Sequence, residues 1–172
     1  MVEIERIEAG SAAEAAGVQA GDRVTHVNGQ AVRDVLDFHF HSSGEELLDL
    51  ALVRGVHAHS CRLVRDGTVD LGLVFVPDRI RLCGNQCVFC FIDQNPEGLR
   101  RTLYVKDEDY RLSFLHGNFV TLTNMKEWEI RRVVEQRLSP MYISVHSTNP
   151  ETRSRLLRSR KERDIGPILD YF

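Results

Sequence analysis

The sequence lacks the features that mark membrane-spanning, secreted and nucleic-acid-binding proteins. No run of 18 uncharged apolar residues occurs, and the N-terminus Met-Val-Glu-Ile-Glu-Arg does not have the basic-then-apolar layout of a signal peptide. The net charge is only -3, whereas a dedicated nucleic-acid binder needs a strong positive field over the phosphates. With 42% hydrophobic and 27% charged residues, the composition predicts a soluble globular protein, and a cytoplasmic location is expected.

Cysteine is also scarce, with four residues in 172, which is too few for a disulfide framework. In a reducing cytosol, clustered thiols bind metal or take part in chemistry, and three of the four lie within residues 83–90. The fourth, Cys61, lies in an expected strand, and we interpret it as a small buried hydrophobic residue.

Charge changes sign along the chain near Pro77. Residues 1–76 hold 6 Lys and Arg against 12 Asp and Glu, whereas residues 77–172 hold 16 against 13. This asymmetry, at a proline that tends to end a strand, predicts two modules, residues 1–76 and 77–172, with a boundary between residues 76 and 80.

The first module has short runs of alternating polarity separated by turn signals, which predict a small β-rich domain. Ser11 and Asp34 are the expected N-caps of two helices, and Asn28-Gly29 is a tight-turn signal. Strands are expected over 2–7, 23–27, 31–32, 47–53, 61–65 and 69–76, with helices over 12–16 and 35–41. Asp66-Gly67 is expected to join the last two strands as a hairpin.

The run from Gly10 to Val24, followed by Val27-Asn28-Gly29, resembles a PDZ domain of the bacterial kind, with the resemblance covering about residues 1–76. In that family, a Gly-Leu-Gly-Phe-like loop receives the C-terminal carboxylate of a peptide, and the adjoining strand edge pairs with the peptide backbone. The nearest match comes at the end of the module, so the resemblance implies a circularly permuted domain. The implied peptide-binding loop consists of Leu71, Gly72, Leu73 and Phe75. The alternative is a small β-rich domain that docks on other parts of its own chain and does not bind peptides.

Two histidine pairs, His39 with His41 and His57 with His59, are each spaced two residues apart, so on a strand each pair would share a face. No nearby carboxylate or thiol is spaced to complete tetrahedral ligation. Scattered surface histidines are therefore favoured over a metal site.

The most informative stretch is Cys83-Gly84-Asn85-Gln86-Cys87-Val88-Phe89-Cys90, with the spacing Cys-x3-Cys-x2-Cys. Three thiolates on so short a loop can converge on one soft metal centre. A structural zinc site would need a fourth ligand at a regular spacing, and the downstream sequence offers only the isolated His116 and His146. An electron-transfer cluster also takes four cysteines, so three suggest an iron-sulfur cube with one iron left open.

This spacing, with the aromatic Phe89 just before the last cysteine, resembles the signature of the radical S-adenosylmethionine (SAM) enzymes. Residues 90–100, 103–114 and 117–124 are similar to one branch of that superfamily, whose members carry an N-terminal PDZ-like domain and are labelled Fe-S oxidoreductases. The resemblance implies that Cys83, Cys87 and Cys90 hold a 4Fe-4S cluster and that SAM chelates its fourth iron. A reductant such as ferredoxin or flavodoxin would supply the electron, and a 5'-deoxyadenosyl radical would attack an unknown substrate. Phe89 is expected near the adenine, with a plain core aromatic as the alternative.

The same resemblance implies an α/β fold in which part of a (β/α) barrel follows the PDZ-like domain, with cofactor contacts at the C-terminal ends of the strands. Strands are expected over 79–82, 119–123 and 141–146, with helices over 127–138 and from residue 150. Thr123 and Asn124 stand where family members carry a Gly-Gly-Glu-like motif, and Ser144 and His146 lie at the next strand end. These four are candidate cofactor or substrate contacts; the alternative for the last two is polar residues satisfied at a strand end.

Two charged stretches are expected to be solvated. Residues 106–111 are interpreted as a surface loop, with substrate contact as a minor alternative. A basic helix is interpreted as a solvated face, with RNA contact as the alternative. Its basic residues are Arg153, Arg155, Arg158, Arg160, Lys161 and Arg163.

Length limits the barrel, because a complete one takes ~250 residues, and only 96 follow residue 76. We therefore expect a truncated barrel that is inactive alone, with exposed sheet edges. The leading hypothesis is the N-terminal part of a radical SAM enzyme. The alternative is a non-catalytic PDZ-like binding protein with a structural zinc or inert Fe-S site, and RNA modification is a third possibility that keeps the radical chemistry. No membrane partner is expected.

Overall fold

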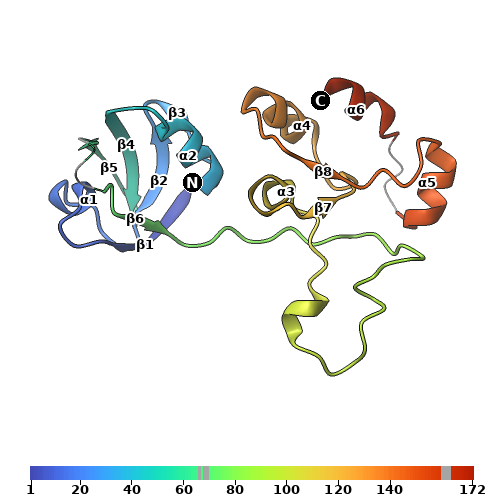
Figure 1. Cartoon of the computed structure of the whole chain (residues 1–172). Coiled ribbons are helices and arrows are strands. Elements are labelled where there is room, and N and C mark those ends of the chain that lie inside the picture. The colour runs from blue at the N-terminus through green and yellow to red at the C-terminus, as the bar shows by residue number, and fades with distance from the viewer. Residues whose placement is uncertain (66, 68–69, 160–163) are drawn as a thin grey trace. The chain divides into compact units, whose positions relative to one another are not determined.

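The structure is a computed structural model that describes residues 1–65, 67, 70–159 and 164–172. The chain divides into two compact units, Met1–Arg79 and Ile80–Phe172. Figure 1 shows the first unit built mainly of strands and the second mainly of helices and loops.

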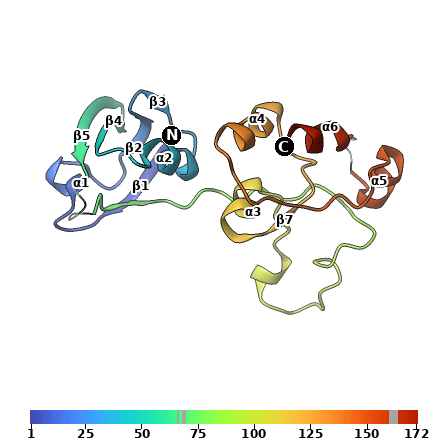
Figure 2. The ribbon, with the colours of Figure 1, turned by 45° about the horizontal axis from the view of Figure 1, so that its top comes forward.

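The first unit is an antiparallel sheet with the strand order β5-β4-β2-β1-β6, and β3 pairs with β2 (Figures 1 and 2). Its strands are β1 (Val2–Ile7), β2 (Arg23–Val27), β3 (Gln30–Ala31), β4 (Leu47–Arg54), β5 (His57–Val64) and β6 (Leu73–Phe75). Along β1 and β4, buried and exposed residues alternate, as expected when one face of a sheet covers a core. The β-rich domain predicted from the sequence is therefore present.

The described part of the first unit also contains two helices, α1 (Ala12–Ala15) and α2 (Val35–Ser42). The caps predicted from the sequence are confirmed, since the side chain of Ser11 accepts a hydrogen bond from the Glu14 amide and that of Asp34 from the Asp37 amide. The apolar core joins residues of the sheet and both helices: Val2, Ile4, Ala13, Val18, Val24, Val27, Val32, Phe38, Leu48, Leu50, Leu52 and Leu63. Cys61 packs against this core, half-buried, as interpreted from the sequence.

One expectation for the first unit is wrong. β6 pairs with β1 and not with β5, so the strands on either side of the expected turn are not hairpin partners; Asp66 itself lies outside the described residues. His39 and His41 lie on α2, in the helix predicted over 35–41, so a shared strand face does not apply to them. His57 and His59 do lie on β5, which begins four residues earlier than predicted because its start pairs with the end of β4.

The second unit contains a parallel strand pair, β7 (Phe119–Val120) and β8 (Tyr142–Ile143), joined through the amphipathic helix α4 (Glu127–Glu135). This β-α-β unit is the arrangement expected of a partial (β/α) barrel. The other elements are the short 3-10 helix η1 (Arg101–Tyr104) and the helices α3 (Tyr110–His116), α5 (Pro150–Leu157) and α6 (Gly166–Tyr171). Asn149 caps α5, where its side chain accepts a hydrogen bond from the Thr152 amide.

Three expectations for the second unit are wrong. Residues 79–82 form no strand; Leu82 makes only an isolated bridge to Asp107. Residues 106–111 are not a solvated loop, because Glu108 and Asp109 are buried and α3 begins at Tyr110. Arg153, expected on a solvated face, is also buried. Arg160, Lys161 and Arg163 lie outside the described residues.

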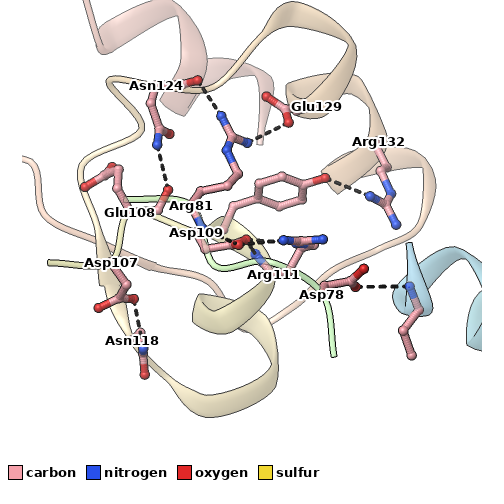
Figure 3. A network of polar contacts seen from close by, with 12 residues as sticks. Asp78, Arg81, Asp107, Glu108, Asp109, Arg111, Asn118, Asn124, Glu129 and Arg132 are labelled. Atoms are coloured by element: carbon pink, nitrogen blue, oxygen red, sulfur yellow. Dashed lines mark hydrogen bonds and ion pairs between the residues drawn. The ribbon is translucent and has the colours of Figure 1, made fainter. Parts of the chain in front are cut away.

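Charged and polar groups pair in the interior of the second unit (Figure 3). Arg81 donates to the Glu129 carboxylate and to the Asn124 carbonyl, each at 2.6 Å. Arg132, 1% exposed, donates to the Tyr110 hydroxyl at 2.8 Å. Buried charges need such partners, because an uncompensated one costs several kcal/mol. These contacts therefore tie α4 to Arg81 and to the first residue of α3.

No helix within the described residues is both long and apolar enough to cross a membrane.

Candidate functional site

The cysteine loop, residues 83–90, is held by backbone hydrogen bonds to segments far away in the sequence. The Cys83 amide donates to the Lys106 carbonyl at 2.7 Å. The Gln86 and Val88 amides donate to the Leu157 and Leu156 carbonyls at 3.0 and 3.2 Å, at the end of α5. The loop is therefore fastened on one side before α3 and on the other at α5.

All three cysteines of the loop line one cavity of about 520 Å³. Its wall combines the loop with the ends of β7 and β8 and the segment before α3. Besides the three cysteines, the lining residues are Asn85, Phe89, Phe91, Ile92, Lys106, Asp107, Glu108, Gly117, Asn118, Phe119, Thr121, Ser144 and His146. The structure thus brings together the predicted metal ligands and three of the five predicted cofactor contacts, Phe89, Ser144 and His146.

The three thiols are free and partly buried. Burial raises the pKa of Cys83 to about 11 and also raises that of Cys87, with further contributions from neighbouring acidic groups. Within the described residues, no three His, Cys, Asp or Glu side chains form a group that could hold a metal ion. The three thiols are ligands of the type that a soft iron-sulfur centre takes, and they line one cavity, but their sulfur atoms are not gathered around a common point.

Phe89 and His146 meet across the cavity, with ring centroids 4.7 Å apart. Phe89 is 37% exposed, so it is not a plain core aromatic. Burial lowers the pKa of His146, as does the charge of Arg153. His146 has a left-handed backbone at φ 63°, a conformation that is rare away from glycine and is found at functional sites.

Thr123 and Asn124 lie away from this cavity, in a neighbouring hollow of about 340 Å³. The buried Thr123 hydroxyl donates to the Asn85 side chain at 3.1 Å. The Asn124 amide donates to the Glu108 carbonyl at 2.9 Å, and its buried Oδ1 has no partner among the described residues. A cofactor role for these two residues stays a prediction.

Sequence reasoning missed four residues that shape the site. Asn85, Glu108 and Thr121 form a hydrogen-bonded group behind the cysteine loop, and Arg153 donates to the Thr121 and Val145 carbonyls at 2.6 and 3.0 Å. A buried arginine on a helix with so many basic residues gives no sequence signal of its own. The charged stretch before α3 was predicted to be solvated because charged residues normally lie on the surface.

The first unit has a groove of about 610 Å³ between α2 and β6. Phe38 and His39 line it from α2, and Leu71, Leu73 and Phe75 from the predicted peptide-binding loop and β6. Gly72 has φ +70°, and a Cβ there would lie 2.1 Å from the Ser11 Cβ, so only glycine fits. β6 is the last strand in the order of the described sheet, so its outer edge has no partner strand there and is available for pairing with an added strand.

Comparison with known proteins gives results for both units. A PDZ-domain model matches residues 3–46. Among solved structures, the PDZ domain of an SdrC-like protein from Listeria monocytogenes matches with a TM-score of 0.38 and 17% identity, over 44% of this chain and 86% of that one. No curated protein matches. The model of the radical SAM-like domain matches residues 65–172, more than half of the chain, and the chain therefore belongs to the radical SAM-like domain family.

Proposed function

We propose that the chain forms the cluster-binding part of a radical SAM enzyme that acts on an unidentified substrate. Cys83, Cys87 and Cys90 would hold a 4Fe-4S cluster, with SAM on the remaining iron. One observation carries the proposal: the three thiols line a single cavity together with Thr121, Ser144 and His146, which follow the carboxyl ends of two parallel strands. That edge is where ligands bind in (β/α) barrels.

Once bound, the cluster and SAM supply one-electron chemistry for radical attack on the substrate. The chain's own residues bind and shield these groups. Phe89, Phe91 and Ile92 give the cavity an apolar side. Lys106, which pairs with Asp93 at 2.5 Å, places a positive charge in the same wall. Because Asp93 already pairs with it, that charge would offset only part of the negative charge of a thiolate-ligated cluster.

Anaerobic reconstitution with iron and sulfide tests the proposal. We expect about four irons per chain, as in a cubane cluster, with a broad visible absorption that changes when SAM is added. Replacing Cys83, Cys87 or Cys90 by alanine should abolish that absorption. Cys61→Ala is the matched control, because Cys61 lies in β5 of the other unit and should leave the iron content unchanged.

The non-catalytic alternative predicts a different result from the same preparation. A colourless chain with one zinc, or a cluster whose spectrum SAM does not alter, would contradict the enzyme proposal. A cytoplasmic location and ferredoxin or flavodoxin as reductant remain predictions.

A second candidate function is peptide binding by the first unit. It is favoured by the groove between α2 and β6, which offers apolar side chains next to an open strand edge. An added peptide strand would pair with β6 and place alternate side chains in the groove.

Selection from a library of peptides with free C-termini tests this function. Peptides that bind the chain and lose binding in Leu73→Asp, which places a charge in the groove, would support it. Recovery of nothing above background would remove it, and the domain would then serve only for docking within the chain.

A further inference from the structure

Asn85 lies between the first two cysteines of the loop and is 6% exposed. Its side-chain amide makes two hydrogen bonds to hydroxyl groups just after β7. Nδ2 donates to Thr121 Oγ1 at 3.0 Å, and Oδ1 accepts from Thr123 Oγ1 at 3.1 Å. The two hydroxyl oxygens are themselves 3.0 Å apart, so the three side chains form a closed ring of polar contacts.

The threonine side of this ring is fixed by buried charged residues. Glu108 Oε1 accepts from the Thr121 amide at 2.6 Å and from its hydroxyl at 2.9 Å. Arg153 donates to the Thr121 carbonyl at 2.6 Å. Glu108 and Arg153 are only 3% and 4% exposed, so the ring rests on groups that solvent does not compete for.

The ring also influences the surroundings of Cys83 Sγ, a predicted cluster ligand. The Asn85 backbone amide lies 3.5 Å from Cys83 Sγ and donates a hydrogen bond to it. Holding the Asn85 side chain therefore holds an N–H group against the first sulfur. Hydrogen bonds to ligand sulfurs raise the reduction potential of a cluster, because they stabilise the more negative, reduced state.

We propose that Asn85 is a positioning residue, which fixes the first turn of the cysteine loop and keeps its amide on the Cys83 sulfur through Thr121 and Thr123. The ring needs a donor and an acceptor on one short side chain. Asparagine has both, aspartate lacks the donor, and leucine lacks both at similar size. The cluster-related part of this inference rests on the proposed function, whereas the fixing of the loop does not.

The first test uses the full chain without cluster. Hydrogen exchange of the amides in residues 84–90 should be faster in Asn85→Leu and Thr123→Val than in the unaltered chain. Thr123→Ser keeps the hydroxyl and should restore slow exchange. Gln86→Ala is the control, because it removes an exposed amide side chain from the same loop. Unchanged exchange in both Asn85→Leu and Thr123→Val would overturn the fixing of the loop.

The second test uses the chain reconstituted with iron and sulfide. Partners of metal ligands change metal affinity about 10- to 100-fold, so iron release to a chelator should speed up by a factor in that range in Asn85→Leu. The reduction potential of the cluster in Asn85→Leu should also become more negative, which a loss of overall stability would not cause. Thr123→Val keeps the volume of the side chain and serves if Asn85→Leu does not fold.

The two tests separate this inference from the proposed function. If the unaltered chain binds no iron, the proposed function fails, and the exchange experiment alone decides whether Asn85 fixes the loop. If the unaltered chain binds a cluster while the variants match it in iron release and potential, the positioning role is overturned and the proposed function stands.

Discussion

In the first unit, β4 and β5 are strands of eight residues each that pair along their whole length over an apolar core. In the second, β7 and β8 are only two residues long, and the interior contains Glu108, Asp109, Glu129, Arg132 and Arg153. Apolar burial is insensitive to exact geometry, whereas buried charges must meet defined partners. The first unit also buries carboxylates, at Asp22, Asp34 and Asp37, but its long paired strands support it as well, so the shape of the second unit depends more on particular polar contacts.

The largest expected effect comes from breaking a buried ion pair in the second unit. Arg81→Met leaves the Glu129 carboxylate, 5% exposed, without its guanidinium partner. The free energy of unfolding should fall by about 4 kcal/mol. Fluorescence of Trp128, the single tryptophan of the chain, reports this unfolding from α4.

A double variant sharpens that result. Arg81→Met combined with Glu129→Leu removes both charges and should recover part of the lost stability, because no carboxylate is then left unpaired. If the single and double variants unfold at the same denaturant concentration as the unaltered chain, charge pairing does not hold this unit.

A core truncation in the first unit should have the next largest effect. Leu50→Ala, at a site 1% exposed, removes buried methyl groups and leaves a cavity. The expected loss is about 3 kcal/mol, measured by hydrogen exchange in β2 and β4. The Trp128 signal should keep its midpoint; a parallel shift of that midpoint would show that the two units unfold together.

A smaller effect is expected from Asp22, whose carboxylate accepts two hydrogen bonds from Arg54 at 2.7 and 2.8 Å. These bonds hold the pKa of Asp22 below its usual value. The carboxylate therefore stabilises the fold above the unfolded pKa of about 3.9, and this contribution is lost as pH falls through the folded pKa. Asp22→Asn should lower the thermal midpoint at neutral pH by less than Leu50→Ala does.

The pH dependence of this difference is the diagnostic measurement. The gap between Asp22→Asn and the unaltered chain should close as the pH is lowered below about 4. A gap that is constant across the acid range would mean that charge at Asp22 does not contribute.

The smallest effect is expected on the surface of the same sheet. Arg62 and Asp49 form an ion pair at 2.6 Å with both side chains more than half exposed. Solvent screens such pairs, so Arg62→Gln should leave the thermal midpoint within experimental error. A clear drop in the thermal midpoint would show that an exposed ion pair also stabilises this sheet, which would contradict the contrast between apolar burial and polar contacts.

The sequence predicted the first unit better than the second, for a physical reason. Period-two alternation and caps such as Ser11 and Asp34 are local signals, and they located most strands and both helices. The pairing of β6 with β1 is long-range, and the local turn signal after β5 misled the prediction.

In the second unit, the cysteine spacing identified the loop, and strand ends identified Ser144 and His146 as cavity residues. The burial of Glu108 and Arg153 could not be predicted, because charged residues are normally solvated and their partners here lie far away in the sequence. The same holds for the ring around Asn85, because Thr121 and Thr123 lie 36 and 38 residues after Asn85 in the sequence.

The most direct measurement of the central claim is electron paramagnetic resonance of the reconstituted, reduced chain with and without SAM. We expect the signal of a reduced 4Fe-4S cluster whose spectrum shifts when SAM binds at the open iron, and loss of that signal in the Cys83→Ala, Cys87→Ala and Cys90→Ala variants. A signal that is identical with and without SAM, or that survives all three substitutions, would contradict it.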